Sequence, residues 1–357
     1  MDAIAALKAA AQAGDVAGAE ALIASHPEAA RDWRPILEAA LFGEPAIVRA
    51  LLAAGADPDA RSTGDSRYRP LHRAIEPKVS IRRKPGHLEV LHALIDAGAD
   101  VDGLGGWYDG RPLQTAARDG MADCAEILLA RGAKRDIFTA VLVADQALFD
   151  AELRADPNKA TAMADSGAEP LHHLAFSRLA QPVAISMAEQ LIAGGARADR
   201  VARMRHGAFS VLSLAAFRGD CDPALIELLI DHGADPQDGL YESLWQGDLA
   251  TTAIVVRRGA DVNLPWKSSG RPMLSEMIQW GRNPAALWLL DAGADPNRAD
   301  ARGWAALHYA ASRGAPASLI ERLLAAGADA GARTNDGLTA AEVGRTAGKA
   351  KAVEALG

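Results

Sequence analysis

The sequence contains little cysteine and few aromatic residues. Two of its 357 residues are cysteines and 5% are aromatic, whereas 49% are hydrophobic. With so few rings, alanine and leucine must supply most of the buried surface, which favours closely approaching helices over a β-rich core. Cys124 and Cys221 each lie in a largely apolar helical stretch without a C-x-x-C or Cys/His cluster nearby. We therefore expect two buried thiols in a reducing compartment.

Long apolar runs and an excess of positive charge are also missing. No stretch reaches about 18 uninterrupted apolar residues, and residues 1–14 lack the features of a secretory signal peptide. The 38 basic and 46 acidic residues give a net charge of −8, the wrong sign for a protein that coats nucleic acid. The sequence predicts a cytoplasmic protein with no membrane and no nucleic acid partner.

Signatures of catalysis are absent from the sequence. There is no G-x-S-x-G elbow, no P-loop and no G-x-G-x-x-G phrase after a strand. His87 and His92 lack the spacing and the partners of a zinc site, and the glycines at 103, 105 and 106 lie in a connecting segment that favours a turn. We expect no catalytic residue, no cofactor and no metal ion.

One short phrase, Gly-Ala followed by a charged residue, returns along the chain. It begins at Gly55, Gly98, Gly132, Gly195, Gly233, Gly259, Gly293 and Gly327, and the last three of these glycines are 34 residues apart. An apolar run with the spacing of one helix face precedes each phrase. Glycine after such a run indicates a helix that ends in a left-handed turn. The aspartates of the phrase recur with it, so we expect them to form hydrogen bonds within the loops.

A second, shorter helical phrase lies upstream of the long helices. Examples are Arg69-Pro70-Leu71-His72, Glu169-Pro170-Leu171-His172 and Ala306-Leu307-His308-Tyr309-Ala310-Ala311. Together the two phrases resemble the ankyrin repeat family, whose unit of about 33 residues reads T-P-L-H-x-A-A, then glycine, then a second helix ending in G-A-D. The resemblance implies an all-α, ankyrin-type helical solenoid of about ten stacked helix-turn-helix repeats, some degenerate, whose connecting fingers form a concave face. It also implies a structural role in the turn for His72, for His308 and for either His172 or His173.

The spacing of the phrases predicts a single continuous array over residues 1–357, with regular and irregular parts. Residues 1–32 form an N-terminal cap, 33–135 regular repeats with an insertion near 76–85, 136–207 irregular repeats, 208–337 further repeats, and 338–357 a C-terminal cap. The interval from Gly132 to Gly195 is 63 residues, nearly two periods. The interval from Gly233 to Gly259 is only 26 residues, so this repeat should lack most of its finger and part of a helix.

Large side chains gather at positions that the repeat itself does not require. The fingers and the ends of the first helices should face the concavity, and aromatic and arginine side chains there favour a recognition surface. The predicted partner- or ligand-binding residues are Trp107, Tyr108, His173, Arg218, Trp245, Trp266, Trp280 and Trp304. Packing of the rings between neighbouring fingers is the alternative interpretation.

Basic residues form two clusters in this acidic chain. The predicted basic patch consists of Arg61, Arg67, Arg82, Arg83 and Lys84 in the first cluster and of Arg200, Arg203 and Arg205 in the second. Guanidinium groups would suit an acidic peptide or a small anionic ligand that carries phosphate or carboxylate. A solvated face without a partner is the alternative.

The sequence as a whole favours a non-catalytic protein–protein interaction module that binds a protein or peptide partner in its concave groove. The alternative is a small-molecule-binding protein or an unusual enzyme. In that case the irregular repeats would close a pocket lined by tryptophan, arginine and His173.

Overall fold

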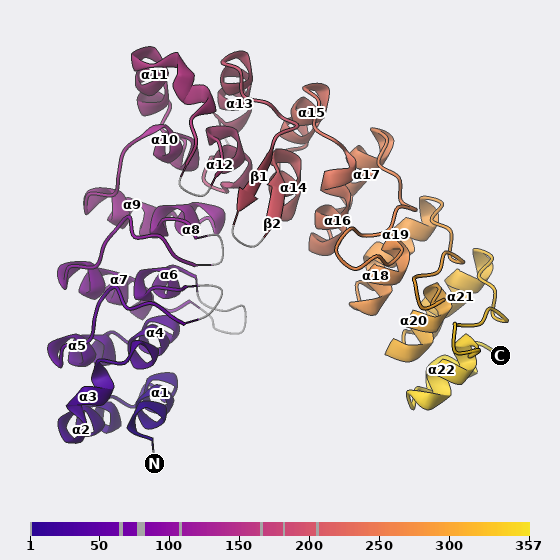
Figure 1. Cartoon of the computed structure of the whole chain (residues 1–357), viewed down its shortest axis with the longest axis horizontal. Coiled ribbons are helices and arrows are strands. Elements are labelled where there is room, and N and C mark those ends of the chain that lie inside the picture. Colours follow the sequence, from indigo (N-terminus) through magenta and orange to yellow (C-terminus); the bar gives the residue numbers. More distant parts are fainter. Residues whose placement is uncertain are drawn as a thin grey trace. The chain divides into compact units, whose positions relative to one another are not determined.

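The computed structural model describes residues 2–63, 67–76, 83–106, 109–164, 167–180, 183–204 and 207–357. Most of these residues lie in helices, as the sequence predicts, and the chain divides into two compact units, Met1–Val211 and Leu212–Gly357. Both units are built mainly from helical pairs, each with a first helix followed by a second helix (Figure 1).

The helical pairs follow one another along the chain without interruption. In the first unit they are α1 (Ala3–Ala13) with α2 (Val16–Ser25), α4 (Trp33–Phe42) with α5 (Pro45–Ala53), α6 (Pro70–Ile75) with α7 (Gly86–Asp96), α8 (Pro112–Arg118) with α9 (Ala122–Ala130), α10 (Ile137–Val143) with α11 (Gln146–Ala155), and α12 (Pro170–Phe176) with α13 (Ala184–Ala193). The pair α14 (Val211–Phe217) with α15 (Pro223–Asp231) begins at the boundary between the units. The second unit continues with α16 (Gln237–Gln246) and α17 (Leu249–Arg257), α18 (Met273–Gln279) and α19 (Asn283–Asp291), α20 (Ala306–Arg313) and α21 (Ala317–Ala325), and α22 (Ala340–Thr346) and α23 (Ala350–Glu354).

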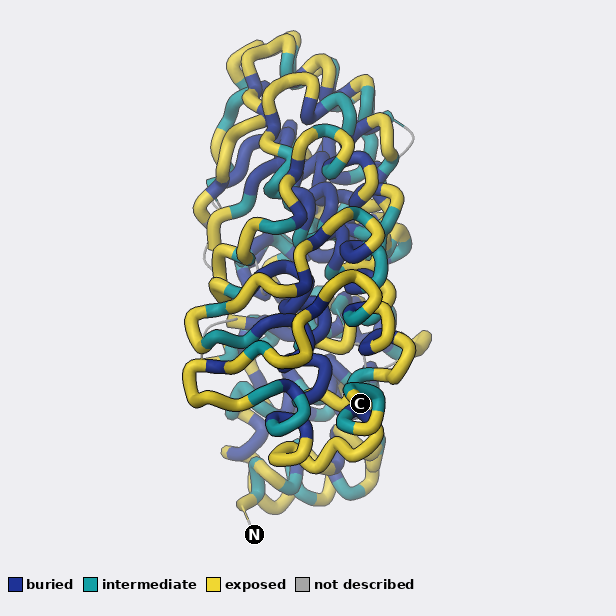
Figure 2. The backbone as a smooth tube through the Cα atoms, turned by 90° about the vertical axis from the view of Figure 1, so that its right-hand side faces the viewer, coloured by how far each residue is buried: buried dark blue, intermediate teal, exposed yellow. Residues whose placement is uncertain are grey.

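Within each unit the first helices form one row and the second helices form another. In the first unit α4, α6 and α8 pack against one another in sequence, and α5, α7 and α9 do the same beside them (Figure 1). In the second unit α16, α18, α20 and α22 form the first row. Buried backbone runs between exposed turns (Figure 2), and alanine and leucine dominate the buried positions, as the composition predicts. This arrangement is a helical solenoid.

The turn after eight of the second helices depends on glycine. The eight glycines of the repeated phrase all have φ between 85° and 110°, the left-handed region that side chains with a Cβ rarely adopt. At Gly259, Gly293 and Gly327 an added Cβ would meet no atom within 4 Å. Glycine is therefore required at these positions because of the backbone conformation and not because space is lacking.

Hydrogen bonds in these turns connect successive repeats. The Asp295 carboxylate accepts from the backbone N–H of Asn297 at 2.9 Å, and the Asn297 side chain accepts from the backbone N–H of Asp329 in the next repeat at 2.8 Å. Asp59 accepts from the backbone N–H of Asp100 at 3.0 Å in the same way. The predicted loop role of the repeated aspartates is confirmed, and we call these contacts the loop ladder.

Buried histidines hold the first turns of several helices. His308 Nδ1 accepts from the backbone N–H of Ala305 at 3.1 Å, and its Nε2 lies 3.2 Å from the carbonyl oxygen of Ala332 in the next repeat. His172 makes the equivalent contacts, so it fills the structural place that the sequence leaves open between His172 and His173. His72 Nε2 lies 2.9 Å from the carbonyl oxygen of Gly110.

The irregular region departs from the repeat in two ways. Instead of a Gly-Ala-Asp turn, α11 is followed by the 3-10 helix η1 (Pro157–Thr161), which Asp156 caps. The finger that follows α13 forms a two-stranded antiparallel hairpin of β1 (Val201–Met204) and β2 (Gly207–Ser210), in which Val201 pairs with Ser210. The first unit also contains the short helix α3 (Pro27–Ala30).

Two predictions concern uneven spacing between the repeats. Residues 77–82 of the predicted insertion near 76–85 lie outside the described residues. The expectation that the repeat between Gly233 and Gly259 lacks part of a helix is wrong, because α16 has 10 residues and α17 has 9. Only the finger is missing, since α16 begins at Gln237 directly after Asp235 and Pro236.

Ala144 predicts a local gain in stability. It links α10 to α11 with φ 60°, where glycine has a similar positive φ in other pairs, for example 77° at Gly247. A left-handed alanine costs roughly 1–2 kcal/mol, partly offset by the freedom that glycine adds to the unfolded chain. We expect Ala144→Gly to raise the free energy of unfolding by up to about 1 kcal/mol and Gly247→Ala to lower it by about 1 kcal/mol, measured by chemical denaturation. A loss of stability in Ala144→Gly would contradict this account.

The buried histidines predict a loss of stability in acid. Burial lowers the pKa of both His72 and His172 to about 4, whereas the unfolded side chains titrate near 6.5. The unfolded chain therefore binds more protons between these values, and stability falls as the pH drops through this window. At pH 5 we expect the first unit to be about 1–2 kcal/mol less stable per histidine than at pH 7. Denaturation of wild type and of His72→Asn at both pH values tests this, because the variant should lose less; an equal loss would count against it.

Candidate functional site

Four aromatic rings of the second unit gather at the first-helix row. Tyr241 and Trp245 are one turn apart on α16, and their rings stack with centroids 5.9 Å apart. Trp266 comes from the next finger and stacks on Tyr241 with centroids 3.7 Å apart. Trp280 caps α18 and meets Trp245 edge-on at 5.8 Å. The rings therefore form one continuous cluster built from two adjacent repeats.

Trp280 is both exposed and fixed in position. The residue is 53% exposed, which is unusual for so large a hydrophobic side chain. Its indole Nε1–H donates to the Glu276 carboxylate at 2.9 Å, and Glu276 itself is only 3% exposed. The ring thus presents apolar surface to solvent in an orientation that a buried acid holds.

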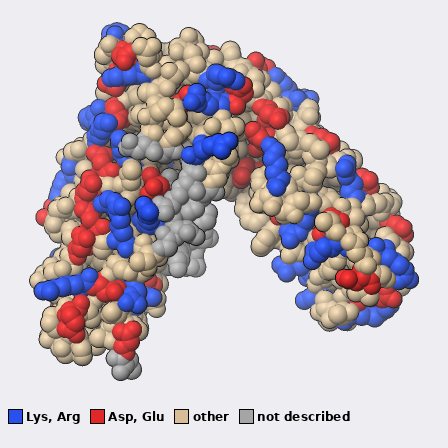
Figure 3. Space-filling view, in the orientation of Figure 1, with Lys and Arg blue, Asp and Glu red and all other residues tan. Residues whose placement is uncertain are grey.

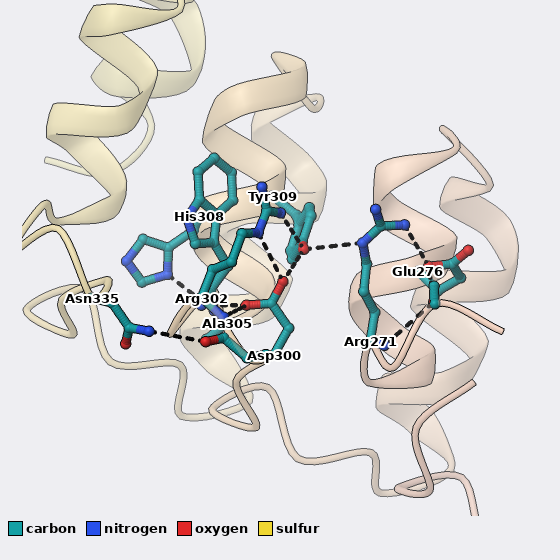
Figure 4. Close-up of polar contacts among 11 residues, drawn as sticks. Arg271, Glu276, Asp300, Arg302, Ala305, His308, Tyr309 and Asn335 are labelled. Carbon is teal, nitrogen blue, oxygen red and sulfur yellow. Dashed lines mark hydrogen bonds and ion pairs between the residues drawn. The ribbon is translucent and has the colours of Figure 1, made fainter. Parts of the chain in front are cut away.

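Glu276 begins a polar network that crosses to the next repeat. Its Oε2 accepts from Arg271 Nη1 at 2.8 Å and from Ser269 Oγ at 2.9 Å. Arg271 Nε then donates to the Tyr309 hydroxyl on α20 at 3.1 Å. Figure 4 shows this hydroxyl between the side chains of Arg271 and Arg302.

Tyr309 is the centre of the network. Its hydroxyl accepts from Arg302 Nη2 at 2.8 Å and donates to Asp300 Oδ2 at 2.6 Å (Figure 4). Asp300 Oδ1 in turn accepts from the backbone N–H of Trp304 at 2.9 Å, which fixes the finger that carries this tryptophan. Burial and the bond to Asp300 raise the pKa of Tyr309, so the phenol stays neutral. The network joins Trp280 to Trp304, and we call Tyr241, Trp245, Trp266, Trp280 and Trp304 the aromatic face.

Two arginines cover rings of the aromatic face. The Arg282 guanidinium carbon lies 4.6 Å from the centroid of Trp245, and that of Arg302 lies 4.7 Å from the centroid of Trp304. Both distances allow cation–π attraction.

The structure brings together only some of the predicted binding residues. Trp245 contacts Trp280 directly and is linked to Trp266 through Tyr241. Trp304 is connected to these rings through the polar network. Trp107, Tyr108, Arg82 and Arg205 lie outside the described residues.

His173 and Arg218 differ from the expectation that they face a groove. His173 is 5% exposed, packs edge-on against Phe138 at 5.2 Å and lies 3.1 Å from Gln114 Nε2. Arg218 is 2% exposed, and its Nε donates to Asp220 at 3.4 Å. His173 lies in α12, and Arg218 lies in the turn directly after α14, so both side chains are buried inside the repeats and not on a groove.

Three of the six described residues of the predicted basic patch are neutralised by acids. Arg83 pairs with Asp123 at 3.0 Å, Lys84 with Glu44 at 2.8 Å and Arg200 with Glu169 at 3.0 Å. Arg61, Arg67 and Arg203 are exposed. Acidic and basic side chains lie close together over the first unit (Figure 3). The clusters in the sequence are therefore not uniform basic surfaces in the described part of the first unit.

Sequence reasoning missed most of the polar network. Arg271, Glu276, Asp300, Arg302 and Tyr309 were not among the predicted site residues. A charged residue in the buried phrase Met273-Leu274-Ser275-Glu276 and a tyrosine inside Leu307-His308-Tyr309 are the signals that could have indicated it.

The described residues have an open depression but no candidate metal site. No group of three or more histidine, cysteine or acidic residues there could hold a metal ion, and no helix is both long and apolar enough to cross a membrane. An open depression of about 440 Å³ lies over the second helices α5 and α7, lined by Arg49, Glu89, His92 and Asp96 among others. Its lining contains no tryptophan, tyrosine or phenylalanine.

The comparisons with known proteins agree with this architecture. The family model for ankyrin repeats (many copies) matches residues 289–343. The ankyrin repeat protein nuc-2 of Neurospora crassa is 28% identical over 246 residues, which cover 64% of this chain and 22% of nuc-2. The chain thus spans about a fifth of the length of this curated relative.

A solved structure shares the fold. The ankyrin repeat domain of Bcl-3, described as a unique member of the IkappaB protein family, is similar with a TM-score of 0.53 at 22% identity. The similarity covers 63% of this chain and 98% of that domain. Helical pairs joined by left-handed glycine turns define a helical repeat protein. More particularly, residues 289–343 match ankyrin repeats and the fold is that of an ankyrin-type helical solenoid; ankyrin repeats are generally protein–protein interaction modules.

The buried carboxylate of Glu276 predicts a large loss of stability on truncation. Glu276→Ala removes the carboxylate that accepts hydrogen bonds from the Trp280 indole N–H and from Arg271 Nη1. Breaking a buried charged pair costs about 3–5 kcal/mol, and the partial exposure of Arg271 reduces this to about 2–3 kcal/mol. Chemical denaturation should show this loss, with Glu321→Ala on α21 within about 0.5 kcal/mol of wild type. Equal stability of the two variants would show that the network is not stabilising.

Proposed function

We propose that the chain is a non-catalytic protein–protein interaction scaffold that binds a protein or peptide partner on the aromatic face of its second unit. The observation that carries this proposal is Trp280, which is 53% exposed and yet held by Glu276 and Trp245. Tryptophan, tyrosine and arginine dominate binding hot spots. A ring that is already fixed loses little conformational freedom when a partner covers it.

The chemistry of the face favours an acidic partner. Its acids are hidden, since the side chains of Glu276 and Asp300 are 4% and 8% exposed. Its cations are more accessible, with Arg302 57% exposed. We also place the protein in the cytoplasm, which is supported by the free and buried thiols of Cys124 and Cys221.

The proposal predicts which side chain a partner needs. Trp280→Ala should weaken binding of a partner isolated with the wild-type chain by about 30-fold, or about 2 kcal/mol, because a central hot-spot ring is lost. Glu321→Ala, on the second-helix row, should bind within about twofold of wild type. Titration calorimetry with purified partner measures both, and denaturation of Trp280→Ala checks that it remains folded.

Two results would contradict the proposal. Unchanged partner affinity in folded Trp280→Ala would exclude the aromatic face as the binding surface. A stoichiometric metabolite in native mass spectrometry, lost in His173→Ala while protein partners are unaffected, would instead support the small-molecule alternative.

A further inference from the structure

The Arg282 side chain has no hydrogen-bonding or ion-pair partner within the described part of the chain. It is exposed and lies over Trp245, yet it makes no hydrogen bond or ion pair with the described residues. Some other exposed arginines of this unit are paired across repeats, such as Arg257 with Glu227 and Arg322 with Asp291. Arg282 therefore presents a guanidinium whose hydrogen-bonding edges are available to another molecule.

Arg302 can also bind another molecule, but unlike Arg282 its guanidinium is held in place by several contacts. Its Nη2 donates to the Tyr309 hydroxyl, its Nε lies 3.3 Å from Asp300 Oδ2, and its plane lies over Trp304. These three contacts fix the guanidinium, while Nη1 makes no hydrogen bond within the described residues. A guanidinium that is already oriented loses less side-chain freedom when it binds an anion.

A series of side-chain contacts links Trp280 to each of these two arginines. Trp245 joins Arg282 to Trp280, and the Glu276–Arg271–Tyr309 network joins Trp280 to Arg302. The indole N–H groups of Trp245 and Trp266 also make no hydrogen bond within the described residues. They can donate to the backbone carbonyl oxygens of an extended segment.

We propose that Arg282 and Arg302 are the specificity-determining residues of this face and that they bind carboxylates of an acidic peptide segment. An apolar side chain of the segment packs on Trp280, and acidic residues on either side of it bind the two guanidiniums. The inference rests on the proposed function and adds to it the chemical class of the partner. Charge complementarity supports it, because the exposed groups flanking Trp280 are cationic and the acids of the network are buried.

Selection from a display library tests the proposal without a known partner. Random 12-residue peptides are selected on the immobilised full chain, and binding of the enriched peptides is measured by fluorescence anisotropy. We expect a consensus of an apolar residue flanked by aspartate or glutamate, with affinity that falls as salt rises. Arg282→Gln and Arg302→Gln should each weaken binding about tenfold, whereas Arg322→Gln should stay within about twofold.

Combining a substitution in the peptide with one in the chain shows which arginine binds which acidic residue of the peptide. Replacing one peptide acid by its amide should cost about tenfold with the wild-type chain and almost nothing with the matching arginine variant. Arg282→Lys should recover only part of the affinity, because lysine keeps the charge but not the paired donors.

The outcomes separate the two proposals. A neutral or basic consensus that still requires Trp280, or an acidic consensus indifferent to both arginine variants, overturns this inference and leaves the proposed function standing. Failure to enrich any peptide overturns the acidic-segment proposal. Enriched peptides that bind Trp280→Ala as well as wild type contradict the proposed function itself.

Discussion

The left-handed glycine after the second helix of the regular repeats is the constraint on which the rest of the structure depends. One helical pair has too little surface to bury its own apolar face, so each pair is stable only when the next one packs against it. A positive φ at the same place in eight repeats returns the chain to the position from which the next pair can pack. The loop ladder then joins neighbouring turns, as Asn297 joins the turn of Asp329.

The aromatic face follows from the same repetition. Equivalent positions in successive repeats lie side by side, so Trp245 at the end of α16 meets Trp280 at the end of α18. The polar network uses the same neighbour relation, because Arg271 and Tyr309 come from adjacent repeats. Burying Glu276 and Asp300 has an electrostatic cost that apolar packing would avoid. In return, the exposed rings have defined orientations, which a binding surface needs.

Sequence periodicity predicts what the repeat itself determines. The regular turns and the places of Trp245 and Trp280 at the ends of their helices follow from counting residues between glycines. Pairing between repeats does not follow in this way. Arg271 and Tyr309 are 38 residues apart, as are His72 and Gly110, and only the second pairing belongs to a family pattern. The burial of His173 and the pairing of Arg83 with Asp123 likewise depend on neighbours that a single sequence does not reveal.

Hydrogen exchange followed by mass spectrometry tests most directly whether contacts between neighbouring regular repeats hold this chain together and keep the aromatic face rigid. The segment from α10 to η1 lacks the glycine turn and contains the left-handed Ala144, whereas the segment from α18 to α21 has regular turns, the loop ladder and the buried network. The account predicts that amides of α10, α11 and η1 exchange earlier than those of α18 to α21, with a difference in opening free energy of about 1 kcal/mol or more. Equal protection in the two segments would contradict it.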